Sequence, residues 1–277
     1  MVKTIADSTS DLTPELIQQH DLEIIPLSVF INGKDYLDGL EITSSILFEL
    51  VERTNEFPKT SAPSIELYRS VFSRYDDLVY IGISSKLSAS MQSSLIALET
   101  SDSSQKVAID SMNLSTGIGL LVLKAAELSR KGKTVSEISN QISNLIPKVH
   151  TAFVIDTLDY LHKGGRCSAM EHLAASLLKI RPVIEVRSDG TLGVREKLGG
   201  SRKKALLSLV NEMRSHSQEL DPQRIFITHC ACPEDAQLLK TVIESLNLFE
   251  EILITEAGTT IASHCGPKTI GIIYMTK

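Results

Sequence analysis

Residues 78–94, LVYIGISSKLSASMQSS, change from one hydrophobic periodicity to another within a short distance. The first six residues form a continuous apolar run that is typical of a buried strand. Leu87, Met91 and Leu95 then recur at the spacing of a helix. A strand followed at once by a helix is the repeating unit of α/β folds, so this stretch predicts a βα unit with a hydroxyl-rich turn between its two parts.

The same alternation extends outward through the first half of the chain. Short apolar runs at 2–6, 22–30 and 106–110 predict strands, and amphipathic runs at 44–55 and 64–75 predict the helices between them. Strands that alternate with helices usually pair in parallel. We therefore expect a largely parallel α/β sheet in the N-terminal half.

The second half of the chain has a different pattern. Residues 181–197 contain Asp189-Gly190 between two strand-like runs, which is a signal for an antiparallel hairpin. Further strands are predicted at 224–228, 250–257 and 269–275, and helices at 170–179, 202–215 and 233–246. We expect an α/β protein of two domains, 1–155 with the parallel sheet and 156–277 with a mixed sheet, and we place the change of pattern within 149–156.

Composition excludes several classes of function. The 277 residues are 42% hydrophobic and 22% charged, as in a globular protein, while the net charge of −6 and the absence of Trp argue against a nucleic-acid partner. The most apolar stretch, 118–126, is too short for a transmembrane segment. Because the four cysteines lack disulfide or zinc spacing and the first residues lack a secretory signal, we expect a cytoplasmic protein.

Three predicted strands end in Asp followed by Ser or Thr, at Asp7, Asp110 and Asp156. In open α/β sheets, ligands bind beyond the carboxyl ends of the strands, so polar residues at these positions are candidates for a binding site. Helix caps and turns explain such pairs equally well. The pattern alone leaves both interpretations open.

Two segments are rich in hydroxyl groups, and the first of them is a candidate for holding a small anion. Ser88 is expected near the N-terminus of the helix that follows the 78–83 strand, where free backbone N–H groups and the helix dipole favour a small negative group. Thr60 and Ser61 lie in the sequence KTSAPS at 59–64, which we expect to be a loop. Helix capping and solvated serines on an exposed face are the alternative explanation.

Arg166 and His264 are the other candidates for a functional role. Arg166 ends LDYLHKGGR, whose basic residues around a Gly-Gly turn suit a phosphate or an acidic protein surface, although neither the P-loop nor the dinucleotide-binding spacing is present. A simple helix stop is the alternative interpretation. His264 lies in GTTIASHCGP at 258–267. His229 precedes Cys230 and Cys232, but a strand directs His229 away from Cys230, so no metal site is expected.

The ordered set of these motifs resembles the DegV family of bacterial fatty-acid-binding proteins, the FakB component of fatty acid kinase systems. The residues that carry the resemblance are Asp7 to Leu12, KTSAPS, SSKLSASMQSS, Asp110-Ser111, YLHKGGR, RPVIEV and GTTIASHCGP, which extend across nearly the whole chain. In this sequence Ala89-Ser90-Met91 replaces the family's usual Gly-Thr-Tyr after the key serine.

The resemblance implies the two-domain DegV-like (EDD-type) fold, with one long-chain fatty acid between the domains. Its carboxyl group would lie near Thr60, Ser61, Ser88 and His264, and Arg166 would face the partner, a dihydroxyacetone-kinase-like fatty acid kinase. That kinase would form an acyl-phosphate for phospholipid synthesis. The resemblance therefore implies a lipid-binding carrier without catalytic residues, metal or cofactor.

Two other classes of function deserve comparison with this expectation. A serine hydrolase would need Ser88 beside His264 or His229, yet the turn lacks the Gly-x-Ser-x-Gly elbow. Ser176-Leu177-Leu178-Lys179 has the Ser-x-x-Lys spacing without its companion motifs. A module that only binds other proteins would leave the hydroxyl-rich segments without a role.

Overall fold

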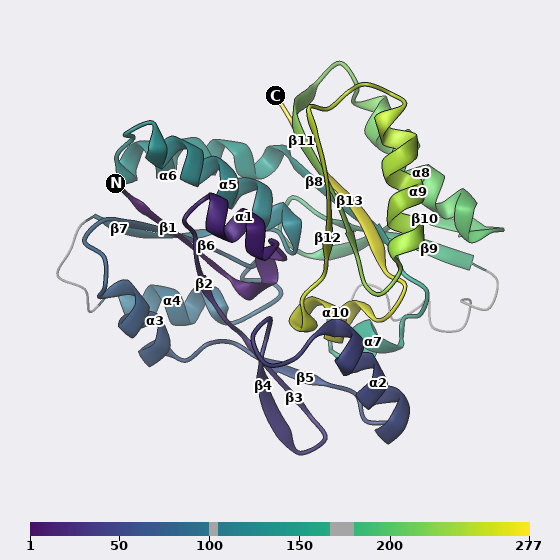
Figure 1. The fold of residues 1–277 in the computed structure, drawn as a ribbon, viewed down its shortest axis with the longest axis horizontal. Helices are drawn as coiled ribbons and strands as arrows, with labels where there is room; N and C mark the ends of the chain where they lie inside the picture. Colours follow the sequence, from purple (N-terminus) through teal and green to yellow (C-terminus); the bar gives the residue numbers. More distant parts are fainter. Residues whose placement is uncertain (100–104, 167–179) are drawn as a thin grey trace.

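The N-terminal half forms a four-stranded sheet in which every neighbouring pair of strands is parallel (Figure 1). The computed structural model describes residues 1–99, 105–166 and 180–277. In the order β2-β1-β6-β7, the strands are Glu23–Ile25, Lys3–Asp7, Leu78–Gly82 and Lys106–Asp110. The prediction of a parallel α/β sheet is confirmed.

Helices cover both faces of this sheet, which explains the continuous apolar run of β6. Leu78 and Tyr80 pack with α3 and α4, while Val79 and Ile81 pack with α5 and α6, and all four side chains are fully buried. The four helices are α3 (Ile65–Phe72), α4 (Ser90–Glu99), α5 (Thr116–Arg130) and α6 (Val135–Leu145).

The C-terminal half forms a six-stranded mixed sheet, as expected. Its order is β10-β9-β8-β13-β11-β12, and only β11 and β12 are parallel neighbours within the described strands. In that order the strands are Leu192–Gly199, Ile180–Val186, Val149–Val154, Ile270–Thr276, Leu220–His229 and Glu251–Glu256. Gly190 adopts φ 79° in the turn between β9 and β10, which places the predicted hairpin at Asp189-Gly190.

Helix α5 lies between the two large sheets and joins their cores. Twelve of its fifteen residues are buried, and its apolar side chains share one cluster with Ile81 of β6 and with Phe153 and Ile273 of the mixed sheet. Helices α8 (Arg202–Ser215) and α9 (Pro233–Glu244) cover the other face of the mixed sheet (Figure 1). The result is a layered α/β architecture in which α5 is the central layer.

The predicted strand at 22–30 is divided between two sheets. Pro26 and Leu27 separate β2 from β3 (Ser28–Ile31), which pairs with β4 (Lys34–Leu37) and β5 (Lys59–Ser61) in a small antiparallel sheet. Proline has no N–H to donate and therefore interrupts strand pairing. The KTSAPS segment, expected to be a loop, begins as β5 because Thr60 pairs with Val29.

Two short helices lie between the small sheet and the mixed sheet. Helix α7 (Asp159–Lys163) contacts α10 (Thr259–Cys265), and α10 also contacts α2 (Ser44–Thr54), β3 and β5. The remaining short elements are α1 (Pro14–Gln19) and the 3₁₀ turns η1 (Ser8–Ser10) and η2 (Ile146–Lys148).

Several sequence predictions concern segments near the division of the chain. Strand β8 (149–154) pairs with strands of the mixed sheet, although the predicted N-terminal domain, 1–155, includes these residues. The predicted helix at 170–179 and the Ser176-x-x-Lys179 motif lie outside the described residues.

Across the described ranges, none of the helices has both the length and the apolar character required to cross a membrane.

Candidate functional site

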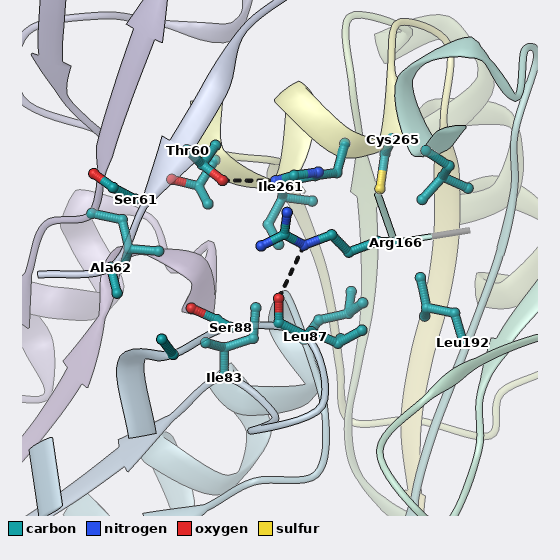
Figure 2. Close-up of a pocket in the computed structure, with 16 residues that line it drawn as sticks. Thr60, Ser61, Ala62, Ile83, Leu87, Ser88, Arg166, Leu192, Ile261 and Cys265 are labelled. Atoms are coloured by element: carbon teal, nitrogen blue, oxygen red, sulfur yellow. Dashed lines mark hydrogen bonds between the residues drawn. The ribbon is translucent and has the colours of Figure 1, made fainter. Parts of the chain in front are cut away.

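A cavity of about 180 Å³ lies where the two halves of the chain meet the small sheet (Figure 2). Its walls come from β5, from the turn between β6 and α4, from α7 and the following turn, and from α10. Thr60, Ser61, Ser88, Arg166 and His264 all line it. All five site residues named from the sequence therefore lie around one space, although they come from four separate segments.

Apolar side chains form most of the remaining wall. Leu27, Ile83, Leu87, Leu114, Leu161, Leu192 and Ile261 line this part of the cavity. A second, smaller cavity of about 20 Å³ shares Leu114, Ile261 and Cys265 with the first and extends toward Phe153 and Ile273 of the mixed sheet. The site thus combines a polar cluster with an apolar wall, and the second cavity lies on the far side of that wall toward the mixed sheet.

His264 joins α10 to the small sheet. Its Nε2 atom lies 2.8 Å from Oγ1 of Thr60, and its buried Nδ1 atom has no hydrogen-bond partner in the described structure. Burial and, to a smaller degree, the nearby charge of Arg166 together lower the pKa of His264 from 6.5 to about 4. The imidazole is therefore neutral at pH 7, and it can either donate to Thr60 or accept from it.

Arg166 is half-buried in the cavity wall. Its Nε donates to the carbonyl oxygen of Leu87 at 3.1 Å (Figure 2). Its Nη1 donates to the carbonyl oxygen of Gly164 at 2.7 Å. Gly164 packs so closely under His264 that a Cβ atom there would lie 2.2 Å from Nδ1. The chain after α7 therefore places a positive charge beside the cluster formed by Thr60, Ser88 and His264.

Ser88 lies two residues before α4, where the sequence placed a helix terminus. Its Oγ accepts a hydrogen bond from the backbone N–H of Ser90 at 3.2 Å and lies 2.9 Å from the Ser90 hydroxyl. The neighbouring Ser84 has a different role, because its buried hydroxyl donates to the carbonyl of Gly190 in the β9–β10 turn. The serine-rich turn thus both lines the cavity and ties the two halves of the chain together.

Two buried carboxylates position α10, and the sequence analysis assigned neither a place in the site. Asp38 accepts hydrogen bonds from the backbone N–H and the hydroxyl of Thr259, both at 2.7 Å, and Asp11 accepts one from the N–H of Gly258 at 2.8 Å. Negative groups at a helix N-terminus are favourable. Since α10 carries His264 and Thr260, these carboxylates fix one wall of the cavity.

Thr260 is a further cavity residue that sequence reasoning missed. Its side chain is buried, and its Oγ1 has no partner within the described structure. Thr260 and His264 are separated by four residues in α10, so they share one helix face. That spacing was the only signal in the sequence, and it could not be used without knowing which face of α10 meets the cavity.

The three strand-end aspartates have different surroundings. Asp7 is fully buried and accepts a hydrogen bond from the N–H of Ile83, and Asp110 accepts hydrogen bonds from the N–H groups of Met112 and Ser85 in the adjoining turns. Asp156 forms ion pairs with Arg181 and Arg202 and does not line the cavity. Asp7 therefore contacts the cavity residue Ile83, and none of these three aspartates is itself a lining residue.

Among the described residues, Ser88 and the two candidate histidines are not arranged as a serine hydrolase requires. His264 bonds to Thr60 and His229 accepts from the N–H of Cys232, so in the described chain neither histidine is hydrogen-bonded to Ser88. No group of three His, Cys, Asp or Glu side chains in the described ranges is arranged to hold a metal ion. The arrangement is instead suited to hydrogen-bonding a polar head group at one end of an apolar space.

Comparisons with known proteins agree with this arrangement. The model of the family described as "Uncharacterised protein, DegV family" matches residues 1–277. A DegV domain-containing protein from Clostridium acetobutylicum is 33% identical and aligns over 100% of this chain and 99% of its own length. Two solved structures align with 100% of this chain and over 99% of their own length. One is a DegV family protein from Thermus thermophilus, described for its fatty acid binding, with 28% identity and a TM-score of 0.94. The other is DegV, a fatty acid binding protein from Bacillus subtilis, with 26% identity and a TM-score of 0.89.

The family model covers the complete chain, and the alignments with these relatives extend from end to end. The α/β architecture with a parallel and a mixed sheet is also that of the solved relatives. This protein belongs to the DegV family.

Proposed function

We propose that this protein binds one long-chain fatty acid, with the carboxyl group at the polar cluster and the acyl chain along the apolar wall. The observation that carries this proposal is the cavity in which Thr60, Ser88 and His264 meet a wall of leucine and isoleucine side chains. The relatives from Thermus thermophilus and Bacillus subtilis, which are described as fatty acid binding, support it.

The acyl chain supplies most of the affinity. Transfer of about 14 methylenes from water at roughly 0.8 kcal/mol each contributes about 11 kcal/mol before the cost of ordering the ligand. The second cavity gives the chain a path past Leu114 and Ile261 toward Phe153 and Ile273. Side chains along this path shift to admit the full tail.

The polar cluster needs only to satisfy the hydrogen bonds of the carboxyl group. Hydroxyl groups and a neutral imidazole do this without adding a permanent charge directly behind the ligand. Two carbonyl groups already occupy Nε and Nη1 of Arg166, so it is not committed to a bidentate pair with the ligand. A carboxyl group held in this way remains available for chemistry by a second protein.

The second part of the proposal is presentation of that carboxyl group to a cytoplasmic, dihydroxyacetone-kinase-like fatty acid kinase. The kinase forms an acyl-phosphate for phospholipid synthesis, and this chain acts as the carrier. Arg166 lies at the cavity edge, half-buried, and its charge suits contact with an acidic partner surface.

The experiment has two stages that test binding and presentation separately. Palmitate is titrated into delipidated wild-type protein and Ser88→Ala, with Ser208→Ala as the matched control because its hydroxyl bonds within α8. The loaded proteins are then given the kinase and ATP, and acyl-phosphate is measured. Saturable binding of one palmitate, weakened only in Ser88→Ala, supports the carrier role. Ester hydrolysis that depends on Ser88 would instead indicate an enzyme.

A further inference from the structure

A separate cavity of about 300 Å³ lies where the parallel sheet begins, and we call it the β1 cavity. Its walls combine Val2 and Thr4 at the start of β1 with His20, which ends α1, and with Ala126 and Arg130 in the last turns of α5. The cavity proposed to hold the fatty acid lies beyond the other end of β6, which is parallel to β1. The two cavities share no lining residue, and a volume of this size suits a small molecule.

Two polar side chains that line the β1 cavity are buried without a hydrogen-bond partner. They are Thr4, which is 3% exposed, and His20, which is 8% exposed, and in the described structure neither Oγ1 of the first nor Nδ1 of the second is bonded. Buried polar groups are nearly always paired in folded proteins, because an unpaired group loses its hydrogen bonds to water without replacement. Since both residues line one cavity, a single ligand there can supply both partners.

The charge that the β1 cavity offers to a ligand is positive. Asp21 also lines the cavity, but it is paired with Nζ of Lys3 at 2.8 Å. Within the described residues Arg130 forms no ion pair, and its Nη2 makes one long hydrogen bond, 3.4 Å, to the carbonyl oxygen of Gln19. The hydroxyl of Ser129 is already committed to the carbonyl oxygen of Val2. The unpaired guanidinium therefore favours an anion over an amine.

The two unpaired side chains can both act as donors. Burial and, to a smaller degree, the charges of Arg130 and Arg224 lower the pKa of His20 from 6.5, so its imidazole is neutral at pH 7.5. A neutral imidazole with its hydrogen on Nδ1 donates one hydrogen bond, and the hydroxyl of Thr4 donates another. The two oxygens of a carboxylate match these two donors, and bonds to an ionised acceptor are the stronger kind.

We propose that the β1 cavity binds a small carboxylate with a short apolar body, whose oxygens receive hydrogen bonds from Thr4 and His20 and whose charge faces Arg130. The buried side chains of Val2 and Ala126 form the apolar wall that its body contacts. This inference does not rest on the proposed function, because the two cavities have no lining residue in common.

The test is a titration of the full-length protein with 3-methylbutanoate at pH 7.5, followed by NMR. The methyl signals of Val2 and Ala126 report on the β1 cavity directly. We expect saturable shifts of both signals with 3-methylbutanoate. Binding of 3-methylbutanamide, which has the same shape without the charge, and of inorganic phosphate is expected to be about tenfold weaker or more.

Variants of the lining residues identify the groups that hold the carboxylate. Thr4→Val is expected to lower the affinity about tenfold, because it removes one donor to a charged group, whereas Thr4→Ser should retain the wild-type affinity. His20→Phe should have an effect similar to that of Thr4→Val. Arg130→Gln should weaken binding and reduce its dependence on salt, while Arg53→Gln, at an exposed position on α2, should change neither.

Two further measurements separate a binding role from a structural role. Without ligand, Thr4→Val is expected to melt at or above the wild-type temperature, because the hydroxyl that it removes has no partner. This variant therefore decides the test even where His20→Phe does not fold. Ser88→Ala should leave the shifts of Val2 and Ala126 unchanged, and loss of these shifts in Ser88→Ala would assign the binding to the other cavity and overturn the inference.

The remaining outcomes are equally decisive. Absence of shifts at Val2 and Ala126 at millimolar 3-methylbutanoate overturns the site. Equal binding of the amide, or tighter binding of phosphate, overturns the choice of a carboxylate. Equal affinity of wild type and Thr4→Val overturns the role of the buried hydroxyl. A wild-type protein that binds 3-methylbutanoate in the β1 cavity and binds no palmitate supports this inference and overturns the proposed function alone.

Discussion

Nε2 of His264 and Oγ1 of Thr60, 2.8 Å apart, join two segments separated by 204 residues in the chain. This contact attaches α10 to β5 across the polar end of the cavity. Both groups therefore have one partner within the protein and retain hydrogen-bonding capacity for a ligand.

We expect Thr60→Val to weaken fatty-acid binding by about 1 to 3 kcal/mol, because it removes a hydroxyl and leaves the buried His264 without its partner. Valine keeps the branched shape of threonine and suits a strand. Affinity for palmitate measures the effect. Thr241→Val, whose hydroxyl bonds within α9, is the matched control, and equal affinity of both variants would place the carboxyl group elsewhere.

The pKa of His264 predicts a loss of stability in acid. The folded protein holds this imidazole neutral down to about pH 4, whereas the unfolded chain protonates it near 6.5. The free energy of unfolding is therefore not reduced by this histidine above pH 6.5. It falls by about 3 kcal/mol as the pH drops to about 4, because the unfolded chain takes up a proton that the folded protein does not. Denaturant unfolding at several pH values should show a shallower acid loss for His264→Gln than for wild type.

The exposed His162 provides the control for this pH experiment. His162→Gln should retain the wild-type dependence between pH 6.5 and pH 4. An identical acid loss in wild type and His264→Gln would contradict the lowered pKa.

The fold was largely predictable because local patterns and burial agree. Strand β6 is apolar throughout since both of its faces are covered, and Asp189-Gly190 closes a hairpin as its sequence indicates. The division of 22–30 at Pro26 was missed because the pattern contains no information on which sheet each part joins. Likewise, β5 exists through its pairing with β3, which local sequence does not reveal.

The candidate site was predictable as a set of residues and not as a geometry. Hydroxyl-rich turns and the family resemblance pointed to Thr60, Ser61, Ser88 and His264, which all line the cavity. The support of α10 was not predictable. Its contacts with Asp11 and Asp38 span 247 and 221 residues, and no periodicity relates partners so far apart.

Asp38→Asn tests this support of α10. Replacing a buried carboxylate that accepts from Thr259 and Ser8 should cost about 1.5 to 3 kcal/mol in the free energy of unfolding and should also weaken fatty-acid binding. Chemical denaturation and palmitate titration measure the two effects. Asp35→Asn, at an exposed position on β4, should change neither. Full stability in Asp38→Asn would show that α10 does not depend on this contact.

Arg166→Gln tests the assignment of Arg166 to the partner surface. Because two carbonyls already occupy Nε and Nη1, we expect fatty-acid affinity to fall less than about fivefold, within the range of one modest hydrogen bond. Acyl-phosphate formation by the kinase should fall much more. Arg214→Gln, on the exposed surface of α8, serves as the control. A parallel loss of affinity and turnover would assign Arg166 to the ligand head group instead.

The most direct test of the fatty-acid-binding proposal is native mass spectrometry of the gently purified protein, followed by release and identification of any bound lipid. The account predicts one long-chain fatty acid per chain, because the cavity pairs one polar cluster with one apolar path. Protein that is lipid-free after purification, and that also fails to bind added palmitate or oleate, would contradict it.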